Sequence, residues 1–129
     1  MRSLYWALLM KMLQLRANFW AEVDDQVVLS DWRIRLLEAV DTAGSISGAA
    51  HQLDISYKLA WERIHEMEER LGQKLVDAQV GGAGGGGASL TPVARDYIQR
   101  WHTFSTGLID VVSEHFQLAF DSEPSPRVD

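Results

Sequence analysis

The chain has 129 residues, 47% of them hydrophobic, and a formal net charge of −6. This length suits one domain with a core of its own plus an added helix, and the acidic balance argues against strong charge-driven binding to nucleic acid. The sequence has no cysteine, which excludes disulfides and thiolate metal sites and fits a reducing compartment such as the cytoplasm.

Residues 1–29 are expected to contain a helix and then a short hairpin, in which Asp24-Asp25-Gln26 separates two apolar runs. Apolar residues recur at steps of three and four, which predicts a helix over residues 3–18 with one apolar stripe. The stripe consists of Leu4, Leu8, Met12, Leu15 and Phe19. Lys11 and Arg16 interrupt this run and no signal-peptide cleavage site follows, so we interpret it as a helix of a soluble protein. No stretch of the sequence is long enough to cross a membrane.

Residues 30–95 have the order of elements of a winged helix–turn–helix. Three helices are predicted, each with a serine at its N-cap, and the first and third end at a glycine. The caps are Ser30, Ser45 and Ser56, and the glycines are Gly44 and Gly72. Residues 75–80 and 88–90 suit the two strands of a wing, and Thr91-Pro92 predicts another helix start. The expected fold class is mostly α (α+β), a winged helix–turn–helix with N- and C-terminal dimerisation helices.

The third of these helices is the candidate recognition helix. Its buried row is expected to be Ala60, Ile64, Met67 and Leu71, which directs Tyr57, Lys58, Trp61, Glu62 and His65 outward. Lys58 could contact a guanine edge or a phosphate, and the Tyr57 hydroxyl a phosphate. Trp61 has two interpretations, because it could half-cover the core or contact DNA or a partner. The acidic residues toward the end of the helix are expected to point away from the duplex.

Serines at the starts of the second and third helices are further candidate DNA contacts. Ser45 and Ser47 lie where backbone N–H groups can hold a phosphate, and plain helix capping is the alternative. Both interpretations can hold together for Ser45. Ser56 opens the candidate recognition helix and belongs to the same predicted DNA-binding set.

Residues 81–88 read Gly-Gly-Ala-Gly-Gly-Gly-Gly-Ala. This run satisfies G-x-G-x-x-G, but a dinucleotide site needs a helix directly after the glycines, and a short strand is expected instead. A phosphate-binding P-loop also fails, because no Lys-Ser/Thr follows. The better interpretation is a flexible wing tip whose backbone N–H groups can approach DNA phosphates. The residues predicted to do so are Gly82, Gly84, Gly85 and Gly86.

The helix that starts at Pro92 carries a heptad seam, because its apolar positions alternate steps of four and three. We expect this helix, residues 92–120, to form the interface of a homodimer. The predicted interface residues are Tyr97, Trp101, Phe104, Leu108 and Val111. The tail, residues 121–129, is rich in Ser and Pro and is expected to be disordered.

No catalytic or metal site can be assembled from the sequence. The four histidines show no ligand spacing shared with acidic residues, so neither a metal nor a cofactor is expected. There is no cysteine nucleophile and no motif around a serine, so the protein is not expected to be an enzyme.

Most of the excess acidic charge lies outside the predicted DNA-reading segment. Residues 31–100 hold eight Lys/Arg against ten Asp/Glu, whereas residues 101–129 hold one Arg against five acidic residues. The predicted winged segment is therefore close to neutral, and weak DNA affinity or help from dimerisation is expected.

Residues 44–95 resemble the N-terminal DNA-binding domain of the ModE family, the molybdate-responsive transcription regulators. The resemblance rests on Ser-Tyr-Lys-Leu-Ala-Trp at 56–61, the glycine run at 81–88 and Leu-Thr-Pro at 90–92. The glycine tip separates this family from the related LysR-type regulators. The resemblance implies a dimeric transcription regulator that binds double-stranded DNA.

Two departures from the family pattern bear on function. Members usually carry a lysine in the glycine tip, where this chain has Ala83. Members bind molybdate in C-terminal domains that follow the DNA-binding domain, and this chain ends at Asp129. We therefore expect a regulator that lacks the molybdate-binding domains, and molybdate is not expected to bind this chain. The alternative is a winged-helix protein-interaction module with weak or lost DNA binding, which the acidic balance favours.

Overall fold

The structure is a computed structural model that describes residues 3–79 and 86–125. The chain divides into two compact units. The first, residues 18–103, is called the winged unit below, and the second, residues 1–17 with residues 104–129, is called the helical unit.

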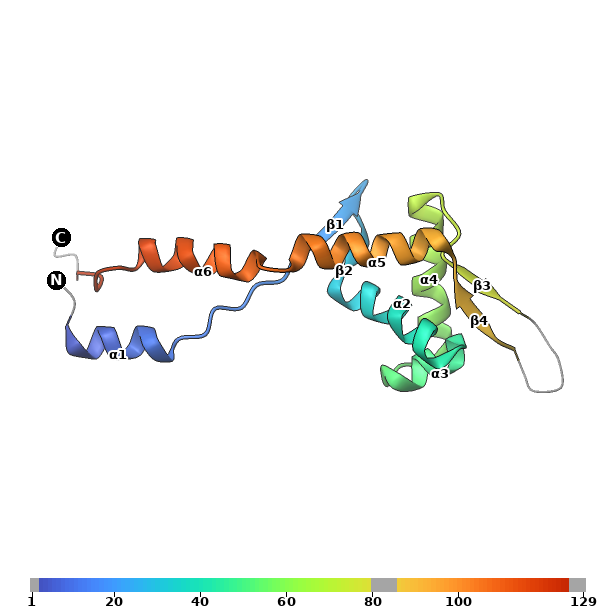
Figure 1. Cartoon of the computed structure of the whole chain (residues 1–129), viewed down its shortest axis with the longest axis horizontal. Coiled ribbons are helices and arrows are strands. Elements are labelled where there is room, and N and C mark those ends of the chain that lie inside the picture. Colours follow the sequence, from blue (N-terminus) through green and yellow to red (C-terminus); the bar gives the residue numbers. More distant parts are fainter. Residues whose placement is uncertain (1–2, 80–85, 126–129) are drawn as a thin grey trace. The chain divides into compact units, whose positions relative to one another are not determined.

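The winged unit holds two hairpins and the helices between and after them (Figure 1). Its elements in chain order are β1 (Trp20–Val23), β2 (Gln26–Ser30), α2 (Asp31–Ala43), α3 (Ile46–Gln52), α4 (Tyr57–Leu71), β3 (Val76–Ala78), β4 (Ala88–Leu90) and most of α5 (Pro92–Ser105). The helical unit holds α1 (Leu4–Met12) and α6 (Leu108–Ala119). The predicted mostly α fold with a two-stranded wing is confirmed.

Helix starts and ends follow the local capping chemistry that the sequence predicts. The hydroxyl oxygens of Ser30, Ser45 and Ser56 accept hydrogen bonds from backbone N–H groups three residues later, at 3.1, 2.9 and 3.1 Å. These bonds satisfy N–H groups that have no partner within the helix. Gly44 and Gly72 end α2 and α4 with φ values of 73° and 66°, a left-handed conformation that glycine adopts without a steric penalty.

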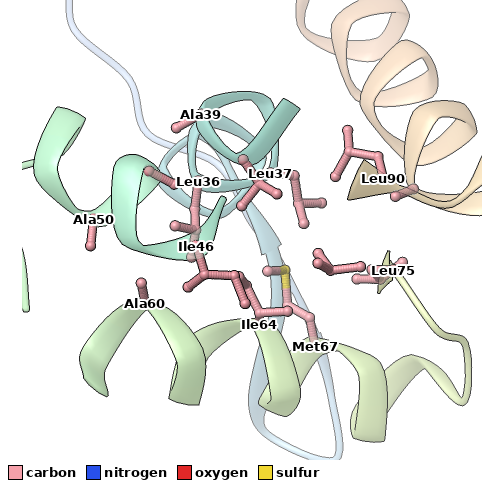
Figure 2. Packing of buried hydrophobic residues seen from close by; sticks show 14 residues of the cluster. Leu36, Leu37, Ala39, Ile46, Ala50, Ala60, Ile64, Met67, Leu75 and Leu90 are labelled. Atoms are coloured by element: carbon pink, nitrogen blue, oxygen red, sulfur yellow. The ribbon is translucent and has the colours of Figure 1, made fainter. Parts of the chain in front are cut away.

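The core of the winged unit lies where α2, α3, α4 and the wing meet (Figure 2). The predicted row on α4 is confirmed, since Ala60, Ile64 and Met67 are fully buried and Leu71 is partly buried. They pack with buried residues of the neighbouring elements, among them Leu36, Leu37, Ile46, Leu75 and Leu90. Each such side chain contributes roughly 1.5–3 kcal/mol when it leaves water.

Both predicted hairpins are present as antiparallel pairs. In the first, β1 pairs with β2, and Asp24 and Asp25 form the turn with positive φ values of 51° and 62°. In the wing, Val76 pairs with Leu90 and Ala78 with Ala88. The Thr91 hydroxyl donates to the Lys74 carbonyl at 2.7 Å and accepts from the Ala94 N–H at 3.2 Å, so it joins the wing to the start of α5.

The predicted helix over residues 3–18 is too long. Helix α1 ends at Met12, and Leu13 has an extended backbone with φ −72° and ψ 129°. A short helix gains most of its stability from packing an apolar face, and α1 buries none of its residues. Leu15 lies beyond the helix end, where it is partly buried and lines a small pocket with Phe116.

The single helix predicted from residue 92 to 120 is also wrong, because the structure has two. Helix α5 ends at Ser105, and α6 begins at Leu108 after Gly107, which has a φ of 78°. Glycine is a poor helix former, and its left-handed φ interrupts the hydrogen-bond ladder. The heptad seam is therefore not continuous.

Two further expectations concern the chain ends and the wing tip. Residues 121–125 have no regular secondary structure, and the rest of the predicted tail lies outside the described residues. Gly82, Gly84, Gly85 and Ala83 lie there as well. Among the described residues, no helix combines the length and apolar character needed to span a bilayer.

Candidate nucleic-acid interface

The turn between α3 and α4 has a defined backbone. Asp54 has a φ of 55°, a left-handed conformation that Asp tolerates better than most residues. The N–H of Asp54 donates to the His51 carbonyl at 3.2 Å, and the N–H of Ile55 donates to the Ala50 carbonyl at 3.0 Å. The start of α4 is therefore held at a fixed angle to α3, as a helix–turn–helix requires.

The first two turns of α4 present the predicted reading residues to solvent. Tyr57, Lys58, Trp61 and His65 are exposed, opposite or beside the buried row. The Lys58 side chain is 85% exposed, and its Nζ lies 3.9 Å from Glu62 Oε1. An ion pair this exposed and this long contributes little, so Lys58 can leave Glu62 for a phosphate or a base edge.

Trp61 does not belong to the buried core cluster, and its side chain is 44% exposed. Its indole ring is stacked on the His65 imidazole, with ring centroids 3.7 Å apart and an interplanar angle of 22°. His65 Nδ1 lies 2.8 Å from the Trp61 carbonyl oxygen. Because a carbonyl oxygen only accepts, Nδ1 of His65 must carry the hydrogen.

Two acidic residues in the second half of α4, Glu66 and Glu68, are bound into the fold. Glu68 Oε2 accepts hydrogen bonds from the backbone N–H groups of Leu75 and Val76, at 2.8 and 3.1 Å. This carboxylate therefore anchors the strand that opens the wing. Glu69 and Glu62 are the acidic side chains of α4 that keep substantial exposure.

Glu66 is the centre of an ion-pair network with three arginines. It lies 3.2 Å from Arg33, 2.8 Å from Arg63 and 3.7 Å from Arg70. Arg33 is only 8% exposed, and burial lowers its pKa, while the hydrogen bond and charge of Glu66 oppose that shift. Arg70 donates to the Val27 carbonyl at 2.7 Å, so the network joins α2, α4 and β2. The expectation that these acids point away from a duplex fits their use inside the fold.

A groove of about 290 Å³ lies at the base of the wing, beside the starts of α3 and α4. It brings together four predicted DNA contacts that are far apart in sequence: Ser45, Ser47, Tyr57 and Gly86. None of the described residues that line it is charged, so no carboxylate there opposes a phosphate. Ser45 is committed to capping through Gly48, whereas Ser47 is exposed.

One backbone hydrogen bond holds the wing base to the end of α2, and another joins the two sides of the wing. The Ala88 N–H donates to the Gly44 carbonyl at 2.8 Å, and the Gln79 N–H donates to the Gly87 carbonyl at 2.7 Å. A Cβ on Gly86 would lie 2.6 Å from the Gln79 carbonyl oxygen, which is too close to be tolerated. Glycine is therefore required at this position for the two strands to approach.

Sequence reasoning missed Gln79 and Ala88 as lining residues of this groove. No sequence pattern pairs Ala88 with Gly44, because the contact depends on how the wing folds back onto the end of α2. Ser56, which was predicted to contact DNA, has its hydroxyl engaged with the Leu59 N–H.

The predicted dimer-interface residues fall into both units. Trp101 is 7% exposed and donates from Nε1 to Asp31 at 2.7 Å, so it completes the fold of the winged unit. Tyr97 packs against the same core. Phe104, Leu108 and Val111 lie in the helical unit, where Leu108 is partly exposed and the other two are exposed.

Within residues 3–79 and 86–125, no group of three or more His, Cys, Asp or Glu side chains is arranged to hold a metal ion.

Residues 32–95 match the family described as bacterial regulatory helix-turn-helix protein, lysR family. The chain is 42% identical over 89 residues to the DNA-binding transcriptional dual regulator ModE of Escherichia coli (strain K12), covering 69% of this chain and 31% of that protein. It is 45% identical over 74 residues to the molybdenum transport protein ModE of Azotobacter vinelandii, covering 57% of this chain and 27% of that protein. It is 36% identical over 93 residues to the molybdenum-pterin-binding protein MopB of Rhodobacter capsulatus, covering 72% and 34%. The chain thus spans about a third of the length of these relatives.

Solved structures show the same fold. The CbnR DNA-binding domain in its DNA complex superimposes with a TM-score of 0.51 at 19% identity, over 68% of this chain and 94% of that one. The BenM DNA-binding domain in complex with benA site 1 DNA gives a TM-score of 0.50 at 23% identity, over 67% and 95%. The sequence relatives show that this chain carries an N-terminal DNA-binding domain of the ModE family, and the solved structures show that its fold is a winged helix–turn–helix.

Proposed function

We propose that this protein is a DNA-binding transcription regulator of the ModE type, in which α4 enters the major groove of double-stranded DNA. The observation that carries the proposal is the exposed start of α4, where Tyr57 and Lys58 adjoin the uncharged groove at the wing base. A helix in the major groove reads base edges from its N-terminal residues and contacts phosphates from its flanks. Lys58 supplies the cation, while Ser47 and Tyr57 supply neutral hydroxyl donors for the backbone.

The relatives support this proposal. The similar protein of Escherichia coli is named a DNA-binding transcriptional dual regulator, and the similar CbnR and BenM domains were solved in complexes with DNA. In this chain the second half of α4 is engaged in the fold through Glu66 and Glu68, which leaves the first half for the duplex.

The alternative is a winged-helix module that binds another protein and has lost strong DNA affinity. It is favoured by the net charge of −6 and by Glu62, whose side chain is 42% exposed beside Lys58. A carboxylate near the phosphates lowers affinity, whereas a protein partner with a basic surface would tolerate it.

Selection of duplexes from a random DNA pool, followed by electrophoretic mobility shift at low and moderate salt, separates the two functions. The regulator should enrich a common sequence and bind it at about 50 mM salt, with affinity that falls steeply toward about 200 mM because counterions are released. If no duplex is enriched and no shift is seen at low salt, the interaction module is the better account.

We also propose that the regulator acts as a homodimer assembled through the helical unit. None of the described residues of this unit is buried, and its helices expose large apolar side chains. Among them are Leu4, Leu8, Met12, Val111 and Leu118, the last of which is 74% exposed. A patch of this kind on a soluble protein marks an association surface.

We further propose that this chain does not itself bind molybdate. A tetrahedral oxyanion needs several converging donors with positive charge nearby, and the groove at the wing base has hydroxyl groups but no cation among its described lining residues. Isothermal titration calorimetry with molybdate at neutral pH should show only the heat of dilution. Binding at micromolar concentration with a defined stoichiometry would contradict this.

A further inference from the structure

We propose that Trp61 reads the 5-methyl group of thymine in the major groove, an inference that rests on the proposed DNA-binding function. Trp61 lies one turn after Tyr57 and Lys58 on the exposed side of α4, and it precedes His65 by one turn. These three aromatic residues, Tyr57, Trp61 and His65, form an exposed row along the first half of the helix.

The Trp61 ring packs on a neighbouring side chain of its own helix. Its contact with the His65 imidazole, at 3.7 Å between centroids, covers part of one ring face, and the bond from His65 Nδ1 to the Trp61 carbonyl fixes the imidazole in turn. An aromatic side chain ordered in this way loses little conformational entropy on binding. His65 is therefore a positioning residue for Trp61.

The Trp61 Nε1–H has no acceptor among the described residues. Other tryptophans of the chain do use this donor: Trp6 donates to the Phe120 carbonyl, Trp20 to Glu22 and Trp101 to Asp31. Trp61 thus offers an apolar surface and one unused hydrogen-bond donor on the helix face proposed to enter the groove.

Thymine is the base whose major-groove edge complements those two features. It presents an apolar methyl group and the O4 acceptor side by side, whereas guanine presents two acceptors and no methyl group. Cytosine presents an amino donor, which cannot pair with an indole N–H. Adenine presents an acceptor and an amino donor but no methyl group. Because only thymine adds a methyl group to an acceptor, Trp61 should favour thymine over the other bases at one or two positions of the site.

Replacing thymine by uracil in the DNA tests the assignment without any change to the protein. Duplexes selected by the wild-type chain are remade with uracil at each thymine in turn, and affinity is measured by fluorescence anisotropy. Loss of one buried methyl group should weaken wild-type binding about fourfold at the position that Trp61 contacts. Trp61→Ala should bind the thymine and uracil duplexes equally.

Trp20→Ala is the matched control, because Trp20 is also half exposed at 53% but lies on β1. It should keep the wild-type preference for thymine. His65→Ala should reduce the preference while its melting temperature stays close to that of Trp20→Ala, which separates positioning from general destabilisation. The assignment is overturned if the wild type does not distinguish thymine from uracil at any position, or if Trp61→Ala keeps the preference. If the wild type selects no duplex, the proposed function itself fails.

Discussion

The winged unit and the helical unit both contain helices with apolar residues, but among the described residues only the winged unit has a buried core. Every buried residue of the described chain lies within residues 18–103, and none lies in residues 3–17 or 104–125. The winged unit therefore resembles a domain that folds alone, whereas the described apolar side chains of the helical unit are at most partly buried. This difference is the basis for our proposal that association with a second copy covers the helical unit.

Helices α4 and α6 show the same contrast at the level of single elements. In α4 the apolar row Ala60, Ile64 and Met67 packs against α2 and α3 and is fully buried. In α6 no residue is buried, although Leu108, Val111 and Leu118 are also spaced at helical intervals. An apolar period predicts that a helix will form, but it does not identify the surface that will cover it.

The largest effect is expected from charges placed in the helical unit. Leu108→Glu together with Val111→Glu should abolish the homodimer, because each side chain buried between copies contributes roughly 1.5–3 kcal/mol and a carboxylate would have to be desolvated there. Sedimentation velocity should show the double variant as a monomer at concentrations where the wild type is a dimer. A double variant that remains dimeric would show that this surface is not the dimer interface. It would also contradict the contrast drawn between the two units.

Replacing one leucine by alanine in each unit tests the same contrast through the stability of the fold. Leu37→Ala in the core of the winged unit should lower the free energy of unfolding by about 2–5 kcal/mol, since it removes buried methyl groups and leaves a cavity. Leu118→Ala, at a position 74% exposed, should change the stability of the isolated chain by less than about 0.5 kcal/mol. Thermal unfolding of both variants at a concentration below dimerisation checks this. Equal losses would show that the helical unit has a core of its own.

A smaller effect on stability is expected from breaking the ion-pair network inside the winged unit. Glu66→Ala should destabilise the fold by about 1–3 kcal/mol, because it leaves the buried Arg33 without its carboxylate. Glu69→Ala removes an exposed acidic residue from the same helix and serves as the control, with little expected change. Urea denaturation of the two variants gives the comparison, and a Glu66 variant as stable as the control would contradict the role assigned to the network.

Much of the winged unit could be predicted because its signals are local. The serine caps at Ser45 and Ser56, the glycine ends of α2 and α4 and the Thr91-Pro92 start each depend on a few neighbouring residues. The buried row of α4 follows from helical spacing. These features require no knowledge of distant parts of the chain.

Contacts between distant residues could not be predicted. Trp101 occupies a heptad position, but its indole N–H donates to the carboxylate of Asp31, 70 residues earlier. The Trp101 side chain is therefore buried in the winged unit. The sequence alone gives no partner for Glu68. In the structure, its carboxylate accepts hydrogen bonds from two backbone N–H groups at the start of the wing. Regular apolar spacing on both sides of Gly107 predicts one continuous helix, whereas the structure has a break at this glycine. The groove at the wing base depends in the same way on backbone contacts to Gly44.

The salt dependence of DNA binding by Lys58→Ala tests the central claim most directly. Lys58 is the exposed cation at the start of α4, and Lys11, an exposed cation of α1, provides a control variant with the same change in charge. If α4 contacts the duplex, Lys58→Ala should weaken binding and flatten the log–log salt slope by about 0.9 when the lost contact is to a phosphate. If Lys58 reads a base instead, the slope should persist and specificity at one position should relax by about 1–3 kcal/mol. Lys11→Ala should leave both quantities unchanged. A Lys58 variant that binds like the wild type in affinity, slope and specificity would contradict the assignment of α4 as the DNA-reading helix.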